Sequence, residues 1–161
     1  MDTKVDAKFD ETLASLGIIA QKNAKKVIGS IMRWRRSQIE NVGSDVIRVH
    51  LSRPVPNQMF RPQDVPGLLN ERKSLVSIYI MCRALIAVLQ SISKDALGDA
   101  LGYSLEETTF EQFKNPDRKL LAQSANHRIN SELYATLLGH LTNVRLVQNC
   151  PLFVPGVNSI L

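Results

Sequence analysis

Residues 9–40, FDETLASLGIIAQKNAKKVIGSIMRWRRSQIE, decide how this chain folds. The segment contains two helical patterns in tandem, and Asn23 between them is a favourable cap because its side chain can accept a hydrogen bond from a free backbone amide. At about 100° per residue, the second helix separates basic side chains from apolar ones. The basic side chains are Lys25, Lys26, Arg33 and Arg36, and the apolar ones are Val27, Ile31 and Trp34. The segment therefore predicts a helix that packs on one face and presents a positively charged stripe on the other.

Two side chains on the apolar side of that helix carry polar groups. Trp34 is expected to pack in the core rather than to form an interface contact, because tryptophan is highly buried on average. Arg35 projects towards the same side. It is expected either to pair with a carboxylate of a neighbouring helix or to extend its guanidinium past the packing.

Composition indicates one folded domain. The chain has 161 residues, of which 44% are hydrophobic and 22% charged, and its net charge is +5. These values predict a single domain over residues 1–161 with a substantial core. A moderate positive charge is shared by proteins that bind nucleic acid, membrane surfaces or acidic proteins. Cys82 and Cys150 are far apart, and the charged N-terminus lacks a signal-peptide core. Both features favour a reducing, cytoplasmic setting.

The strongest apolar run is LVSIYIMCRALIAVL at residues 75–89. With Arg83 at its centre, the run is too short and too charged for a bilayer crossing, so it predicts a helix buried among neighbouring helices. A buried charge is normally paired. The predicted partner of Arg83 is Glu106, Glu107 or Glu132.

The rest of the chain is also helical in pattern, with one long interruption. Residues 41–66 contain Gly43 and four prolines and predict an irregular loop, although the alternation at 46–51 could form an extended strand. Ser104 and Glu107 have capping-box spacing, which predicts a helix start there. The pair Asn115-Pro116 ends that helix, and a last helix is expected over about 124–148 before an irregular tail at 149–161. Its predicted inward face is Ile129, Leu133, Leu137, Leu141 and Val144.

Together these patterns predict an all-α fold. Five to six helices joined mostly by short links, with one long proline-containing loop, suit an antiparallel array of the HEAT or armadillo type. A symmetric four-helix bundle fits less well, because the helix at 75–89 is apolar nearly all round. No clean internal repeat is visible in the sequence.

No catalytic pattern is present. His50, His127 and His140 are spread over a loop and the last helix, and they do not form a joint ligand set. The sequence has no glycine-rich phosphate loop and no nucleophile elbow. We therefore expect no enzymatic activity, no metal, no cofactor and no small-molecule substrate.

Three segments carry a resemblance to a known family: FDETLASLGIIAQKNAKKVIGSIMRWRRSQ (9–38), LLNERKSLVSIYIMCRALIAVLQSI (68–92) and LGDALGYSLEETTFEQFKNPD (97–117). With this spacing, the chain resembles the N-terminal region of the Furry family of cell-morphogenesis proteins over roughly residues 5–147. After Arg145 it departs from the family pattern, which has another charged helix where this chain reads LVQNCPLFVPGVNSIL. The resemblance implies the N-terminal piece, or a truncated form, of a longer helical-repeat scaffold.

The resemblance also implies partners. Family members are non-enzymatic scaffolds that hold an NDR-class kinase with its Mob coactivator, and an upstream Ste20-like kinase, for morphogenesis and polarised growth. The resemblance further implies that the protein is cytoplasmic and enriched at growth sites or the cell cortex. The candidate protein-binding residues are those of the stripe, Lys25, Lys26, Arg33 and Arg36. The alternative is a basic helical module that binds nucleic acid or an anionic membrane surface, in which case binding would weaken steeply with salt.

Overall fold

The first helical segment bends where the sequence predicts it. The computed structural model describes residues 3–50, 65–93, 96–114 and 116–145, with side chains for 7–38, 69–93, 96–114 and 116–145. Helix α1 (Thr3–His50) is interrupted at Asn23, whose φ of −141° and ψ of 43° are not helical. Asn23 thus divides α1 into a first half, residues 3–22, and a second half, residues 24–50. The predicted tandem of two helices is confirmed.

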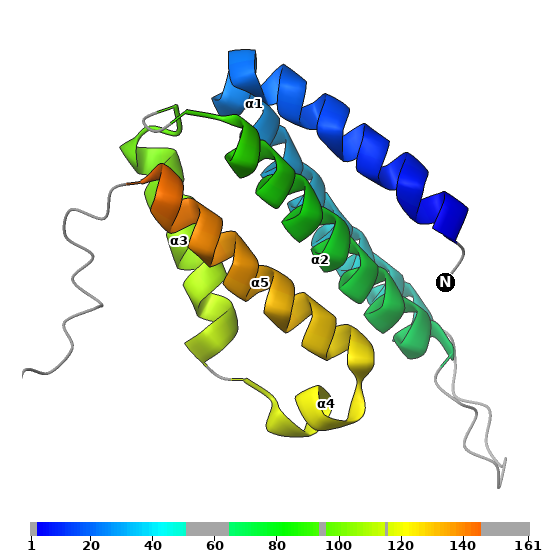
Figure 1. Cartoon of the computed structure of the whole chain (residues 1–161). Helices are drawn as coiled ribbons and strands as arrows, with labels where there is room; N and C mark the ends of the chain where they lie inside the picture. The colour runs from blue at the N-terminus through cyan, green and yellow to red at the C-terminus, as the bar shows by residue number, and fades with distance from the viewer. Residues whose placement is uncertain (1–2, 51–64, 94–95, 115, 146–161) are drawn as a thin grey trace, which may run out of the picture.

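Successive helices alternate in direction and form two layers. The first half of α1, helix α2 (Val65–Ser91) and helix α5 (Ala125–Val144) lie side by side in one layer, and the second half of α1 and helix α3 (Asp99–Lys114) lie behind them (Figure 1). Asn130 Nδ2 donates to the carbonyl of Leu75 over 3.0 Å, and His140 lies 3.2 Å from Gln90. The residue numbers of the two partners increase together from one contact to the next, so α2 and α5 run in the same direction.

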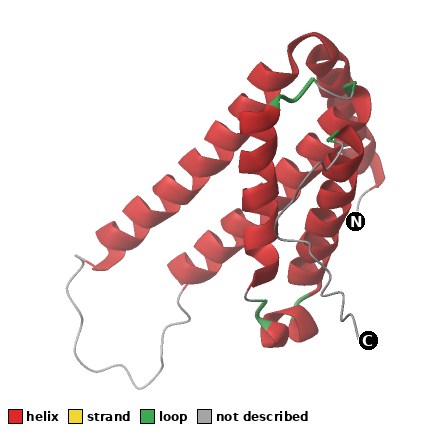
Figure 2. Ribbon diagram, turned by 90° about the vertical axis from the view of Figure 1, so that its left-hand side faces the viewer, coloured by secondary structure: helices red, strands yellow, loops and turns green. Residues whose placement is uncertain are grey.

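The same comparison orients the remaining helices. Phe9 stacks near Tyr79, and a Cβ atom on Gly17 would contact Ser91, so the first half of α1 runs parallel to α2. The second half of α1 and α2 extend towards the same end of the molecule as antiparallel neighbours (Figure 2). All regular structure in the described residues is helical. The predicted all-α helical array is confirmed, whereas its HEAT or armadillo type stays a prediction.

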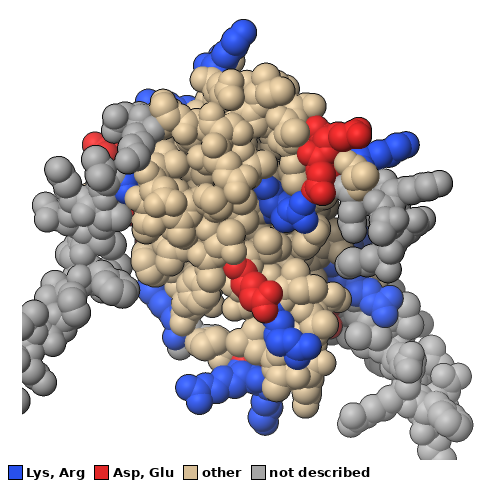
Figure 3. Space-filling model, viewed as in Figure 1, with Lys and Arg blue, Asp and Glu red and all other residues tan. Residues whose placement is uncertain are grey.

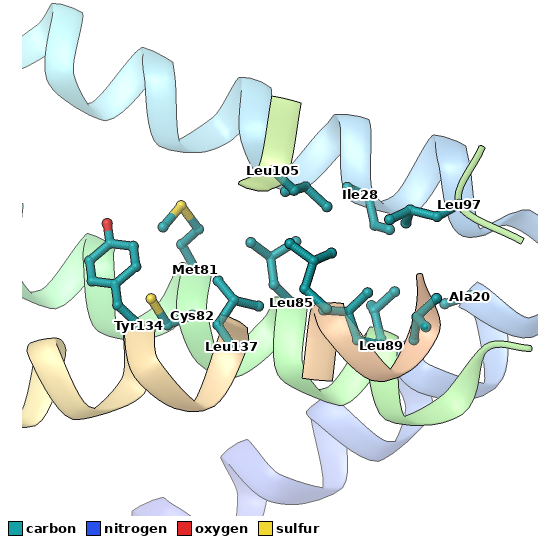
Figure 4. Packing of buried hydrophobic residues seen from close by; sticks show 13 residues of the cluster. Ala20, Ile28, Met81, Cys82, Leu85, Leu89, Leu97, Leu105, Tyr134 and Leu137 are labelled. Carbon is teal, nitrogen blue, oxygen red and sulfur yellow. The ribbon is translucent and has the colours of Figure 1, made fainter. Parts of the chain in front are cut away.

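One continuous core joins the two layers (Figure 4). It receives Ile28 from α1, Leu85 from α2, Leu105 from α3 and Leu137 from α5, all nearly inaccessible to solvent. Leu97, in the turn before α3, completes the contact between the layers. Because α1, α2, α3 and α5 each contribute apolar residues to the same cluster, burial of these residues provides most of the stability of the four helices.

The buried apolar side chains of helix α2 lie in its C-terminal half, whereas Asn70 and Ser77 are buried polar residues of its N-terminal half. Met81, Cys82, Leu85 and Leu89 lie in the core, whereas Val76 near the other end is 56% exposed. By length and composition alone, Leu69–Ser91 is long and apolar enough to cross a membrane. Helices buried in protein cores share that property, and the core contacts of α2 agree with the predicted core helix.

Helix α3 begins earlier than its capping box indicates. The predicted start at Ser104 is wrong, because α3 runs unbroken from Asp99 to Lys114 through Gly102. Gly102 is buried and lies under Arg145 of the last helix, where a Cβ atom would be only 2.5 Å from the arginine Cδ. The turn into α3 contains Gly98 with φ of +71°, a backbone conformation that favours glycine. The predicted stop at Asn115-Pro116 agrees with the end of α3 at Lys114.

A short helix that the sequence analysis did not predict precedes α5. Helix α4 (Arg118–Gln123) is capped by Asp117, whose carboxylate accepts hydrogen bonds from the amides of Lys119 and Leu120. Ser124 caps the start of α5, as expected for a helix beginning near residue 124. Leu137, Leu141 and Val144 of its predicted face are buried, but Ile129 is exposed. The inward face of α5 therefore begins later than its periodicity suggests.

Both ends of the predicted long loop are helical. Residues 41–50 continue α1, so the predicted loop start at 41 is wrong, and the extended strand considered for 46–51 is not formed at 46–50. Gly43 alone costs a helix only about 1 kcal/mol, and the first proline comes at Pro54. At the other end, α2 begins at Val65. Pro66 is tolerated there because it lies in the first turn of the helix. Residues 51–64, and the predicted irregular tail at 149–161, lie outside the described residues.

Two glycines predict opposite effects of the same substitution. A Cβ atom on Gly17 would overlap the Ser91 hydroxyl and lie 3.3 Å from the carbonyl oxygen of Ala87, whereas one on Gly139 would meet nothing within 4 Å. We expect Gly17→Ala to lower the free energy of unfolding by about 1 to 2 kcal/mol through overpacking, and Gly139→Ala to raise it by up to about 1 kcal/mol through helix propensity. Urea denaturation monitored by circular dichroism measures both values. Equal effects of the two changes would contradict the close approach of α1 to α2.

Candidate protein-binding surface

The predicted stripe lies on the surface of the second half of α1. Lys25, Lys26, Arg33 and Arg36 are all exposed. The Lys25 ammonium extends towards the turn before α3, where a Cβ atom on Gly98 would lie 3.1 Å from Nζ. Arg33 Nη2 donates to the Ser30 hydroxyl over 3.2 Å. From Lys25 to Arg36 the stripe extends over about 16 Å at 1.5 Å per residue.

No carboxylate of the described side chains neutralises the stripe. None of its four cations forms an ion pair with a side chain in the described parts of the chain. The layer that contains the first half of α1, α2 and α5 faces the viewer in Figure 3, and on that face a few separate basic and acidic groups lie among mostly uncharged residues. The stripe belongs to the second half of α1 in the other layer. Its positive potential is therefore available to a partner that approaches from that side.

Arg35 lies between the stripe and the core. Its guanidinium is partly buried, and loss of hydration lowers its pKa. Its charge acts on Tyr134 and Cys82, and no carboxylate of the described residues pairs with it. Burial nevertheless dominates at Cys82 and raises its pKa to about 12. Of the two expected arrangements of Arg35, pairing with a carboxylate of a neighbouring helix is therefore not found among these residues.

Trp34 is exposed, contrary to its predicted burial. Its side chain retains 37% of its accessible surface. The centre of the buried face of this helix is formed by Ala24, Ile28 and Arg35, about 100° away around the helix axis. Trp34 therefore lies at the edge of the packed face, next to the N-terminal half of α2. The sequence pattern placed it on the apolar side of the helix but could not show where the neighbouring helix ends.

Arg83 is paired, but not with a predicted partner. It contacts the carboxylate of Asp10 in the first half of α1 and donates to the Tyr79 hydroxyl over 2.7 Å, so the proposed partners Glu106, Glu107 and Glu132 are wrong. Its guanidinium also lies 5.6 Å from the ring centroids of Phe9 and Tyr79. Because Arg83 and Asp10 are both partly exposed, their ion pair contributes at most about 1 kcal/mol.

Glu106 has a different partner from the one considered in the sequence. It forms an ion pair with Arg145 at 3.2 Å, and the Arg145 guanidinium lies 4.1 Å from the ring centroid of Tyr103. Together with Gly102 beneath it, Arg145 joins the end of α5 to α3. This arrangement depends on the antiparallel pairing of two helices, so no local pattern predicts it.

The two histidines whose side chains the structure describes, His127 and His140, do not converge. The His127 ring lies within hydrogen-bond distance of the Ser124 hydroxyl and 4.0 Å from the Glu71 carboxylate, whereas His140 lies beside Gln90. Across the described ranges, no group of three or more His, Cys, Asp or Glu side chains is placed to hold a metal ion. His50 is helical in the backbone, and its side chain lies outside the described ones.

Comparison with known proteins places the chain among morphogenesis proteins. The family model described as "Cell morphogenesis N-terminal" matches residues 71–153. Cell polarity protein mor2 of Schizosaccharomyces pombe is 24% identical over 155 residues, covering 96% of this chain and 6% of that protein. Cell morphogenesis protein PAG1 of Saccharomyces cerevisiae is 24% identical over an alignment of 235 positions, gaps included, covering 97% of this chain and 10% of that protein. No solved structure matches.

These matches differ in whether they include the residues of the stripe. The family model begins at residue 71, after the stripe, whereas the alignments with the two relatives cover nearly the whole chain. The chain spans no more than a tenth of the length of either relative. Both are named for cell polarity or morphogenesis rather than for a reaction.

Proposed function

Because this chain belongs to the cell morphogenesis N-terminal family, we propose that it forms a non-enzymatic scaffold segment of a longer helical-repeat protein for cell morphogenesis and polarised growth. Its partners are an NDR-class kinase with its Mob coactivator and an upstream Ste20-like kinase. The segment acts in the cytoplasm, at sites of polarised growth or at the cell cortex. Support for the general role comes from the family description and from the names of both relatives.

The observation that carries the protein-binding role is the exposed stripe, whose cations form no ion pair with the described side chains. Four cations project from one helix over about 16 Å, above a core that side chains of the chain itself form. A positive surface of this kind accelerates association with an acidic partner and selects against basic ones. We therefore assign to Lys25, Lys26, Arg33 and Arg36 the docking of an acidic surface of the kinase assembly.

Charge reversal in the stripe tests this assignment. We expect the double variant Arg33→Glu, Arg36→Glu to bind the purified NDR kinase–Mob complex about tenfold to a hundredfold more weakly, because two attractive contacts become repulsive. Its helical circular dichroism and melting temperature should stay unchanged, since both side chains are exposed. Isothermal titration calorimetry at low and at moderate salt measures the affinity.

The matched control is Arg118→Glu, Lys119→Glu, which changes the net charge equally at exposed positions of α4. Equal weakening by both double variants would assign the effect to net charge and reject the stripe as a docking site. Binding that is steeply salt-dependent, directed to duplex DNA or anionic vesicles and absent for the kinase complex would favour the basic module instead.

A further inference from the structure

The first half of α1 packs along one side of α2. Asp10 contacts Arg83, Phe9 lies beside Tyr79 with 6.3 Å between ring centroids, and Gly17 approaches Ser91 closely. Because the two helices run in the same direction, this contact follows α2 from Tyr79 to its C-terminal end. That side of α2 is therefore shaped to receive a helix.

Beyond this contact, towards the N-terminus of α2, the same side carries apolar residues that stay exposed or half-buried. At about 100° per residue, Leu69, Val76 and Ile80 lie on the same side of α2 that contacts the first half of α1 nearer the C-terminal end of α2. Leu69 is 51% exposed and Val76 is 56% exposed. Trp34 and Gln38 of the second half of α1 form the opposite wall, and a hollow of about 360 Å³ lies between the walls. We call this surface, lined by Trp34, Gln38, Leu69, Arg72, Lys73, Val76, Ser77 and Ile80, the α2 lane.

The described charges of the α2 lane have one sign. Among the side chains of the lane that the structure describes, Arg72 and Lys73 are charged and none is Asp or Glu. A neighbouring hollow of about 450 Å³ lies on the other side of Val76 and extends to Ile129. Arg72 is the one charged residue among the described side chains that line it. Arg72 forms no ion pair with the described side chains. An occupant with carboxylates along the edge of its apolar face would thus find an uncompensated guanidinium.

We propose that the α2 lane binds an amphipathic helix of a partner protein, with an apolar face against Trp34 and Val76 and acidic residues beside Arg72. From Leu69 to Ile80 the lane is about 16 Å long at 1.5 Å per residue, which corresponds to three helical turns. Apolar residues at positions i, i+3, i+4 and i+7 of the partner would fit this length, as in other helix-in-groove complexes. Exposed tryptophan and arginine are also the residue types that contribute most at interfaces. The inference does not depend on the stripe or on the kinase assembly.

Trp34 provides the means to test this proposal, because it is the only tryptophan of the chain. The full chain is titrated with a synthetic amphipathic helical peptide that carries leucines at the stated spacing and flanking glutamates, and with a second peptide that has lysines for the glutamates. We expect the acidic peptide to shift Trp34 emission to shorter wavelength and to bind about tenfold more tightly than the basic one. Val76→Glu should abolish the shift.

Charge exchange makes the test specific. Arg72→Glu should reverse the preference between the two peptides, whereas the exposed control Arg118→Glu and the stripe variant Arg33→Glu, Arg36→Glu should keep it. Absence of an emission shift with either peptide would overturn the proposal. Equal binding of both peptides, unaffected by Arg72→Glu, would also overturn it. A concentration-dependent shift without peptide, together with a doubled mass in sedimentation, would identify a second copy as the occupant and reject a partner helix.

Discussion

Replacing Leu85 by alanine is expected to lower the free energy of unfolding by about 2 to 5 kcal/mol. Leu85 is 1% exposed and lies at the centre of the cluster to which α1, α2, α3 and α5 all contribute. Truncation removes its transfer free energy and leaves a cavity that four helices cannot close together. Urea denaturation of the wild-type chain and the variant, followed by circular dichroism, measures the difference.

Leu69→Ala is the matched control, because it is the same change in the same helix at a position that is 51% exposed. Its expected cost is below about 1 kcal/mol, since most of the side chain is already in contact with water. Similar costs at both positions would mean that the core is not centred on the C-terminal half of α2.

Cys82 is expected to react with a thiol reagent roughly a thousandfold more slowly in the native chain than in the unfolded chain. It is fully buried, and burial raises its pKa from 9.0 to about 12, which alone lowers the thiolate population near neutral pH by about three powers of ten. A Cys150→Ser background leaves a single cysteine. The rate of reaction with Ellman's reagent, with and without denaturant, measures the protection.

The same pKa predicts how stability changes at alkaline pH. Above pH 9 the unfolded chain loses a proton that native Cys82 retains, so the free energy of unfolding should fall as the pH rises towards 12. Burial raises the pKa of Tyr134 as well, which acts in the same direction. Cys82→Ala should reduce this pH dependence.

The labelling experiment gives the outcome that would contradict the burial of Cys82, namely a reaction of the native chain with Ellman's reagent as fast as that of the unfolded chain.

Much of the helical architecture follows from local sequence. Asn23, the pair Asn115-Pro116 and Ser124 mark helix boundaries that the structure confirms, because capping and proline chemistry act within a few residues. Prediction failed where a local signal was weak. Gly43 did not end α1, because a single glycine costs a helix only about 1 kcal/mol. The capping box at Ser104 did not begin α3, because packing of that helix on its neighbours overrides such a local signal.

Pairings between helices were beyond local prediction. Arg83 was expected to be paired, which burial of its helix already required, but its contact with Asp10 depends on the parallel packing of the first half of α1 against α2. The partners Glu106 and Arg145 meet only because α3 and α5 run antiparallel. In both cases the residues are far apart in the chain, and their separation in sequence carries no information about the contact.

The candidate surfaces show the same division. The amino-acid sequence by itself determined that the chain is all-helical and that Lys25, Lys26, Arg33 and Arg36 share one helix face, since the 3.6-residue period places side chains around an axis. Their role in binding stays a prediction. Only the tertiary structure decided that Trp34 and Val76 remain exposed, because exposure depends on where the first half of α1 lies along α2. A helical period identifies an apolar face, whereas the extent to which that face is covered is set by the neighbouring helices.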